Sequence, residues 1–162
     1  MTDVNILVVS VILGRVGLPI AWLVLPERTG RGNSAHNHRV AVMRDVLSIL
    51  PAERIRALTM DREFIGKGWL GWLRLMDVAY VVRVRKKALI GGRPASFMCG
   101  RNRWKKWSGG LHKVFGQEVH FAAKRIKKGR DSHVAVISNV YSGTEALDIY
   151  RLRLQSRRFS VT

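Results

Sequence analysis

Asp61 is the residue in this sequence whose type and position best suit chemistry. It ends an apolar run over residues 55–60 that predicts a buried strand, and apolar residues with helical spacing follow over 63–76. A carboxylate at the C-terminal end of a buried strand stands where open α/β sheets place their active sites. Carboxylate oxygens are also the ligands that divalent cations prefer. The pattern therefore predicts a catalytic or metal-binding acid at position 61.

The same spacing has a structural interpretation, because an Asp at a strand-to-helix turn also serves as a helix N-cap. Spacing alone favours neither interpretation. Glu63 is expected in the first helical turn, where the macrodipole favours an acid. Arg62 is expected at the surface, with contact to a phosphate as the alternative. Trp69 and Trp72 share one helix face and are expected to pack in the core rather than stack on bases.

The chain is strongly basic, and most of the charge lies in its second half. The 162 residues carry a net charge of +18, of which +3 falls on residues 1–81 and +15 on residues 82–162. A basic excess gathered in one part of a chain favours a polyanionic partner, most commonly nucleic acid. A solvated basic surface without a ligand is the alternative.

Two basic segments are candidates for contact with nucleic acid. The first alternates aromatic and cationic residues, which suits stacking on unpaired bases together with contact to phosphates. It comprises Trp104, Lys105, Lys106 and Trp107. The second is a run of cations that would line a groove for the nucleic-acid backbone. It comprises Lys124, Arg125, Lys127 and Lys128. The structural alternatives are a hairpin with a solvated lysine turn and an ordinary solvated turn.

The apolar stretch over residues 6–25 is long enough to span a membrane, but a strand hairpin explains it better. Arg15 near its middle would cost roughly 2.5–3.5 kcal/mol on insertion into a bilayer. Near-continuous apolar composition favours two strands buried on both faces, at 6–13 and 18–25, with a turn over 14–17. The single cysteine, Cys99, fits a reducing compartment. We therefore expect a cytoplasmic protein without membrane contact.

The remaining patterns predict a mixed α/β fold. A helix over residues 40–50 is expected to begin after an N-cap at Asn33 or Ser34 and to end at Pro51. The basic, Gly-rich segment 86–130 is interpreted as a strand-rich insertion. The other expected elements are strands at 79–84 and 134–140 and a helix at 144–153.

Several stretches of the sequence carry a resemblance to a known family. They are Gly32-Asn33-Ser34, Asp61 to Gly66, Tyr80 to Arg85, the opening hairpin and Tyr150-Arg151-Leu152-Arg153. Over nearly the whole chain they resemble transposases of the insertion-sequence-four family. This resemblance implies an RNase H-like fold and the chemistry of DDE enzymes, which act on DNA.

The resemblance also implies a two-metal mechanism. In the family, two Asp and one Glu hold two Mg²⁺ or Mn²⁺ ions, which activate water and then a 3′-hydroxyl for attack on phosphodiesters. Asp61 matches the second Asp, and Tyr150 and Arg153 match residues that support the active site near the Glu. Arg157 stands at the position of the Glu, and Asp3 is too close to the hairpin to match the first Asp. We therefore expect residues 1–162 to form a partial RNase H-like domain, without the first central strand and catalytically incomplete by itself.

The sequence leaves functions of different classes open. The first is a DNA transposase catalytic-domain fragment in the bacterial cytoplasm, associated with the nucleoid. Its partners would be DNA and an intact transposase as a dimer partner, with no small-molecule substrate. The second is a non-enzymatic basic DNA-binding module or a truncated inhibitor of transposition. An unrelated RNase H-like nuclease ranks last, because no motif supports further acids beside Asp61.

Overall fold

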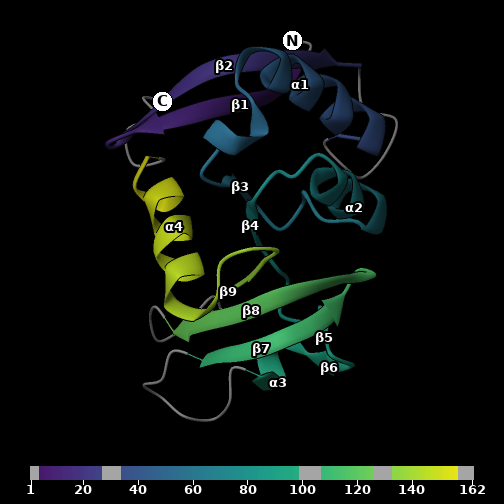
Figure 1. Cartoon of the computed structure of the whole chain (residues 1–162), viewed down its shortest axis with the longest axis vertical. Coiled ribbons are helices and arrows are strands. Elements are labelled where there is room, and N and C mark those ends of the chain that lie inside the picture. The colour runs from purple at the N-terminus through teal and green to yellow at the C-terminus, as the bar shows by residue number, and fades with distance from the viewer. Residues whose placement is uncertain (1–3, 27–33, 99–106, 126–132, 157–162) are drawn as a thin grey trace.

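The computed structural model describes residues 4–26, 34–98, 107–125 and 133–156, which form a mixed α/β fold (Figure 1). This confirms the expected fold class. The strands are β1 (Asn5–Leu13), β2 (Val16–Leu25), β3 (Leu58–Met60), β4 (Tyr80–Arg83), β5 (Leu89–Ile90), β6 (Arg93–Pro94), β7 (Trp107–Val114), β8 (Gln117–Arg125) and β9 (His133–Ser138). The helices are α1 (His36–Ile49), α2 (Lys67–Leu75), α3 (Ala95–Met98) and α4 (Gly143–Ser156), with a 3₁₀ turn at Ala52–Arg54.

Five strands form one mixed sheet in the order β3-β4-β9-β8-β7. β3 and β4 run parallel, with Met60 opposite Val82, whereas β9, β8 and β7 continue the sheet in antiparallel fashion. Within the described part of 86–130 the chain is strand-rich, as expected. Its two long strands, β7 and β8, extend the main sheet. Because β3 and β4 are parallel, their C-terminal ends lie at the same edge, and Asp61 follows β3 there.

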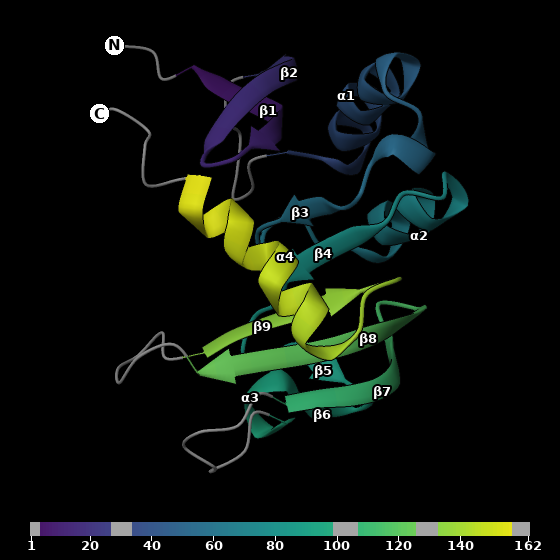
Figure 2. The same ribbon diagram turned by 60° about the vertical axis from the view of Figure 1, so that its left-hand side comes forward.

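Helices cover the sheet on both faces. Tyr150 of α4 shares a buried cluster with Val81 of β4 and Val136 of β9. Leu70 of α2 shares a second cluster with Val82 of β4. Successive residues of a strand point to opposite faces, so Val81 faces α4 and Val82 faces the side of α2. Figure 2 shows α4 crossing one side of the sheet and rising toward the hairpin.

β1 and β2 pair only with each other in the described part of the chain and form a separate two-stranded sheet. Leu13 lies opposite Val16, so the turn consists of Gly14 and Arg15 and is shorter than expected. Gly14 has a φ of +61°, in the left-handed region that tight hairpin turns require and that glycine adopts without a Cβ clash.

The hairpin buries one face only, so the expected burial on both faces is wrong. Leu7 and Ala21 turn inward and are each 8% exposed, whereas Val8 and Trp22 are 48% and 63% exposed. Val8 and Trp22 lie opposite each other in the ladder, so their side chains share the outer face. The alternation of buried and exposed positions is not evident in the sequence, because apolar residues occupy both faces of the hairpin.

The elements around Asp61 are shorter than the sequence predicts. β3 begins at Leu58 rather than at residue 55, because the 3₁₀ turn and its C-cap precede it. α2 begins at Lys67, after its N-cap Gly66, rather than at residue 63. Glu63 therefore lies before the helix, and its expected place in the first helical turn is wrong.

The ends of α1 are partly as expected. Pro51 directly follows the C-cap Leu50, as predicted. The N-cap is Ala35, so the prediction of Ser34 is wrong, and Asn33 lies outside the described residues. The Ser34 hydroxyl instead accepts a hydrogen bond of 2.9 Å from Nε of Arg39.

The paired tryptophans of α2 pack in the core, as expected. Trp69 is 4% exposed and stacks on Trp72 with ring centroids 5.6 Å apart. Its Nε1 donates a hydrogen bond to Sδ of Met60 at 3.2 Å. The indole of Trp69 therefore fixes α2 against the last residue of β3, immediately before Asp61.

Tyr80 carries a hydroxyl that is buried without a hydrogen-bond partner in the described part of the chain. An unsatisfied buried polar group destabilises the folded state. We expect Tyr80→Phe to raise the free energy of unfolding at pH 7 by about 1 kcal/mol in urea titrations. Tyr141→Phe is the matched control and should lower it, because the Tyr141 hydroxyl donates to the carbonyl oxygen of Arg56.

Tyr80 should also make stability fall in alkaline solution. Burial raises the pKa of Tyr80 from 10.0 to about 12, against the opposing charge of Arg74. Ionisation of Tyr80 therefore leaves the free energy of unfolding unchanged below pH 10 and lowers it as the pH rises from 10 toward 12, because the folded state keeps the proton that the unfolded state loses. Tyr80→Phe should flatten this part of the profile of unfolding free energy against pH. An equally steep decline in that variant would assign the effect to other groups.

Candidate active site

Asp61 lies directly after β3, at the edge of the main sheet. Its Oδ1 accepts the backbone N–H of Arg62 at 3.0 Å, and its carbonyl oxygen accepts the N–H of Phe64 at 2.9 Å. These bonds close a turn between β3 and α2. Because the N-cap of α2 is Gly66, the interpretation of Asp61 as a helix cap is wrong.

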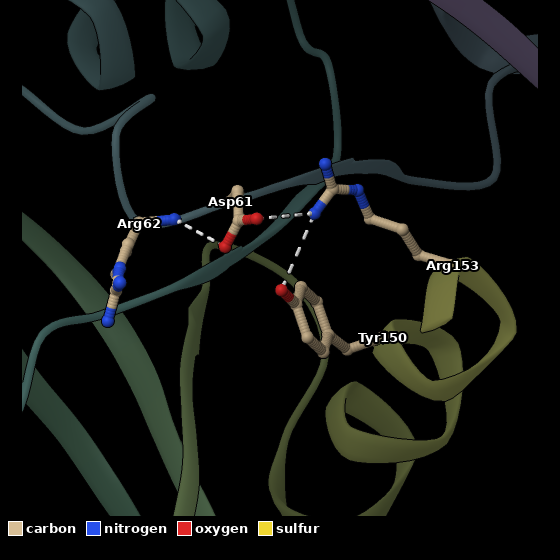
Figure 3. Close-up of polar contacts among 4 residues, drawn as sticks. All are labelled: Asp61, Arg62, Tyr150 and Arg153. Atoms are coloured by element: carbon tan, nitrogen blue, oxygen red, sulfur yellow. Dashed lines mark hydrogen bonds and ion pairs between the residues drawn. The ribbon is translucent and has the colours of Figure 1, made fainter. Parts of the chain in front are cut away.

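The structure brings Asp61 together with Tyr150 and Arg153 of α4 (Figure 3). Nη1 of Arg153 lies 3.6 Å from Oδ2 of Asp61 and donates to the Tyr150 hydroxyl at 3.5 Å. The side chains of Asp61 and Arg153 are 18% and 16% exposed, so the ion pair is largely shielded from water. Residues far apart in the sequence thus form one polar cluster at the end of β3.

Tyr150 is held in its neutral form. Burial raises the pKa of its phenol, and the negative charge of Asp61 raises that pKa further, while Arg153 and Arg83 oppose the rise. At pH 7 the phenol is therefore protonated and has an O–H to donate. It cannot act as a general base without first losing that proton.

Two arginines that the sequence analysis did not single out also contribute to the site. Arg39 of α1 donates from Nη2 to the carbonyl oxygen of Glu63 at 3.1 Å, and its guanidinium lies 5.3 Å from the centre of the Phe64 ring. These contacts tie the segment after Asp61 to α1. No local pattern marks Arg39, because its role depends on tertiary packing. Arg83 lies within the Tyr80 to Arg85 stretch, which is one of the stretches that carry the family resemblance.

The described residues do not fit a two-metal site. No group of three or more His, Cys, Asp or Glu side chains comes together within the described ranges. The carboxylate of Asp61 is engaged by the guanidinium of Arg153. Two-metal sites clamp both ions between shared ligands, and a neighbouring cation repels a divalent ion. Metal binding by Asp61 therefore remains a prediction.

The candidates for nucleic-acid contact are described only in part. Trp104, Lys105, Lys106, Lys127 and Lys128 lie outside the described residues. Trp107 begins β7 and lies opposite Ala123, two residues before Arg125 at the end of β8. Lys124 is exposed. The described residues of the two segments therefore lie at the same end of the β7–β8 pair, but contact with DNA stays a prediction.

Arg62 is exposed, as expected of a surface residue. In Figure 3 its side chain leaves Asp61 on the side opposite to Arg153. Its alternative role, contact with a phosphate, remains a prediction.

Among the described residues, no helix has the length and apolar composition needed to cross a membrane.

Comparison with known proteins places the chain in a family. A comparison with curated proteins finds no match. Residues 8–155 match the family described as the transposase DDE domain, and this range includes Asp61, Tyr150 and Arg153. The five-stranded mixed sheet is consistent with an RNase H-like domain of this kind. The chain belongs to the family of transposase DDE domains.

Proposed function

We propose that this chain is part of the catalytic domain of a DNA transposase of the insertion-sequence-four type. One observation carries the proposal: within the range that matches the family, Asp61 at the end of β3 contacts Arg153, which contacts Tyr150. A strand-tip acid beside a Tyr-x-x-Arg helix is the arrangement that the sequence resemblance implies. DNA is the expected substrate, in the bacterial cytoplasm at the nucleoid. An intact transposase is the expected protein partner.

We also infer that the chain by itself does not cleave or join DNA. The ion pair with Arg153 neutralises the charge of Asp61, and Arg83 adds a second cation near the same cluster. For this site to hold Mg²⁺ or Mn²⁺, Asp61 would have to leave Arg153, and further carboxylates would have to be supplied. What the cluster offers without them is a polar, cationic surface for a phosphodiester.

The experiment is a nicking assay on supercoiled plasmid with Mg²⁺ or Mn²⁺, run for the natural chain and for Asp61→Asn. We expect no difference between the two, and no change in either when the metal is removed by a chelator. DNA binding is measured in parallel by fluorescence anisotropy and should be detectable in both. Metal-dependent nicking that disappears in Asp61→Asn would show that the chain is a complete enzyme. Absence of DNA binding would contradict the proposed function itself.

A further inference from the structure

A cleft of about 650 Å³ opens beside the Asp61 cluster, and its lining is almost purely cationic on its polar side. Among the described residues, the ionisable side chains that line it are those of Arg62, Arg83, Arg85, Lys86, Lys87 and His133, and no acid is among them. Like charges this close repel one another, and an anion bound among them would lower that repulsion. The cleft therefore has the electrostatics of a site for a polyanion.

The fold holds these charges in place. Val84 donates its N–H to the carbonyl oxygen of Ala135 at 2.9 Å, so the chain leaving β4 stays beside the first residues of β9. The carbonyl oxygen of Lys86 accepts the N–H of Ser96 at 2.9 Å, which ties the basic loop after β4 back to α3. A basic loop fixed at both ends loses less entropy on binding than a free one.

Two residues that line the cleft also interact with the Asp61 cluster. Arg62 follows Asp61 directly, and its backbone N–H donates to the Asp61 carboxylate. Arg83 lines the cleft and also lowers the pKa of Tyr150 through its charge. A chain of phosphates lying in the cleft would therefore pass beside Asp61.

We propose that this cleft binds the sugar-phosphate backbone of one DNA strand next to Asp61. The proposal rests on the proposed function and adds the residues that hold the substrate. Guanidinium groups form paired hydrogen bonds with phosphate oxygens, and such contacts set the register of a protein on DNA without reading its sequence. Five permanently cationic side chains suit several consecutive phosphates better than one free ion. The described lining of this site includes no residue of the two basic segments predicted from the sequence, and Arg62 is the one lining residue for which the sequence suggested contact with a phosphate.

The test compares two triple variants that remove the same charge. The cleft variant is Arg62→Gln, Arg85→Gln and Lys87→Gln, and the control is Arg44→Gln, Lys113→Gln and Arg151→Gln. All six side chains are exposed, and the control residues do not line the cleft. Affinity for a short duplex is measured by anisotropy across a salt series. The cleft variant should bind at least about tenfold more weakly near 0.1 M salt, and its slope of log affinity against log salt should be shallower by roughly 2 to 3.

The control variant should keep most of its affinity and a slope close to that of the natural chain. Equal losses in the two variants would overturn the cleft and leave only general electrostatic attraction, with the proposed function intact. A natural chain that does not bind DNA would overturn both. Exchanging chloride for inorganic phosphate at equal ionic strength should change DNA affinity little. Selective displacement of DNA by phosphate from the natural chain would instead show a site for a free phosphate ion.

Discussion

Asn139→Ala is expected to lower the free energy of unfolding by about 3 kcal/mol. Asn139 follows β9, and its side chain holds the start of β4 through two hydrogen bonds. Its Oδ1 accepts the N–H of Tyr80 at 2.8 Å, and its Nδ2 donates to the carbonyl oxygen of Val78 at 3.1 Å. Val78 and Tyr80 are fully buried. Truncation would therefore leave a backbone donor and a backbone acceptor without partners in the core, and each such group costs about 1–3 kcal/mol.

Ser142→Ala is the matched control, because Ser142 is exposed and lies three residues further along the same connection. Urea denaturation should show the loss for Asn139→Ala only. Hydrogen exchange should show faster exchange at the Tyr80 amide in particular. A loss below about 1 kcal/mol would mean that water replaces both hydrogen bonds of the amide. β4 carries Arg83 and pairs with β3, which is directly followed by Asp61. The two hydrogen bonds of Asn139 therefore also stabilise the strands that position Asp61.

The position of Asp61 was predictable because it depends on local patterns. An apolar run that stops at an acid is visible in the sequence, and the structure does place Asp61 at the end of a strand. The start of α2 was misjudged because Phe64 and Ile65 continue the apolar pattern of the helix. The hydrogen bond from the N–H of Phe64 to the carbonyl oxygen of Asp61 belongs to a separate turn. Periodicity alone does not distinguish such a turn from a first helical turn.

The environment of Asp61 could not be predicted from local patterns, because it is made by residues distant in the sequence. Its contact with Arg153 depends on how α4 crosses the sheet. Arg153 and Tyr150 were predicted as site residues from the family resemblance alone. The basic cleft also depends on tertiary structure, since β9 brings His133 to the loop after β4. The excess charge of the second half pointed to a polyanion but did not show where the cations meet.

The family resemblance predicted a domain without its first central strand, but the exposed outer face of the hairpin was not predicted. β1 pairs only with β2 and β3 only with β4 within the described residues, so each presents an edge without a strand partner. A cleft of about 650 Å³ lies between those edges. Consecutive residues line it from both sides, 7–12 of β1 and 57–60 at β3, as expected when strand edges rather than strand faces border a space.

The hairpin should therefore open far more often than the main sheet. A two-stranded sheet alone is marginally stable in water, and this one is supported mainly by α1. We expect native-state hydrogen exchange to show protection in β1 and β2 lower than in β8 and β9 by at least about a thousandfold. Leu7→Ala should accelerate exchange in the hairpin alone, because Leu7 belongs to that locally opening unit.

Phe121→Ala is the matched comparison, because Phe121 is fully buried in β8 and its loss should accelerate exchange throughout the main sheet. The reason for the difference is that no ladder hydrogen bonds between described residues cross the cleft, so that opening the hairpin breaks no ladder bond of the five-stranded sheet. If Leu7→Ala accelerated exchange in β8 and β9 as much as in β1, the two sheets would unfold as one cooperative unit. The contacts of α1 and α4 with the hairpin would then couple its unfolding to that of the main sheet, in place of backbone pairing.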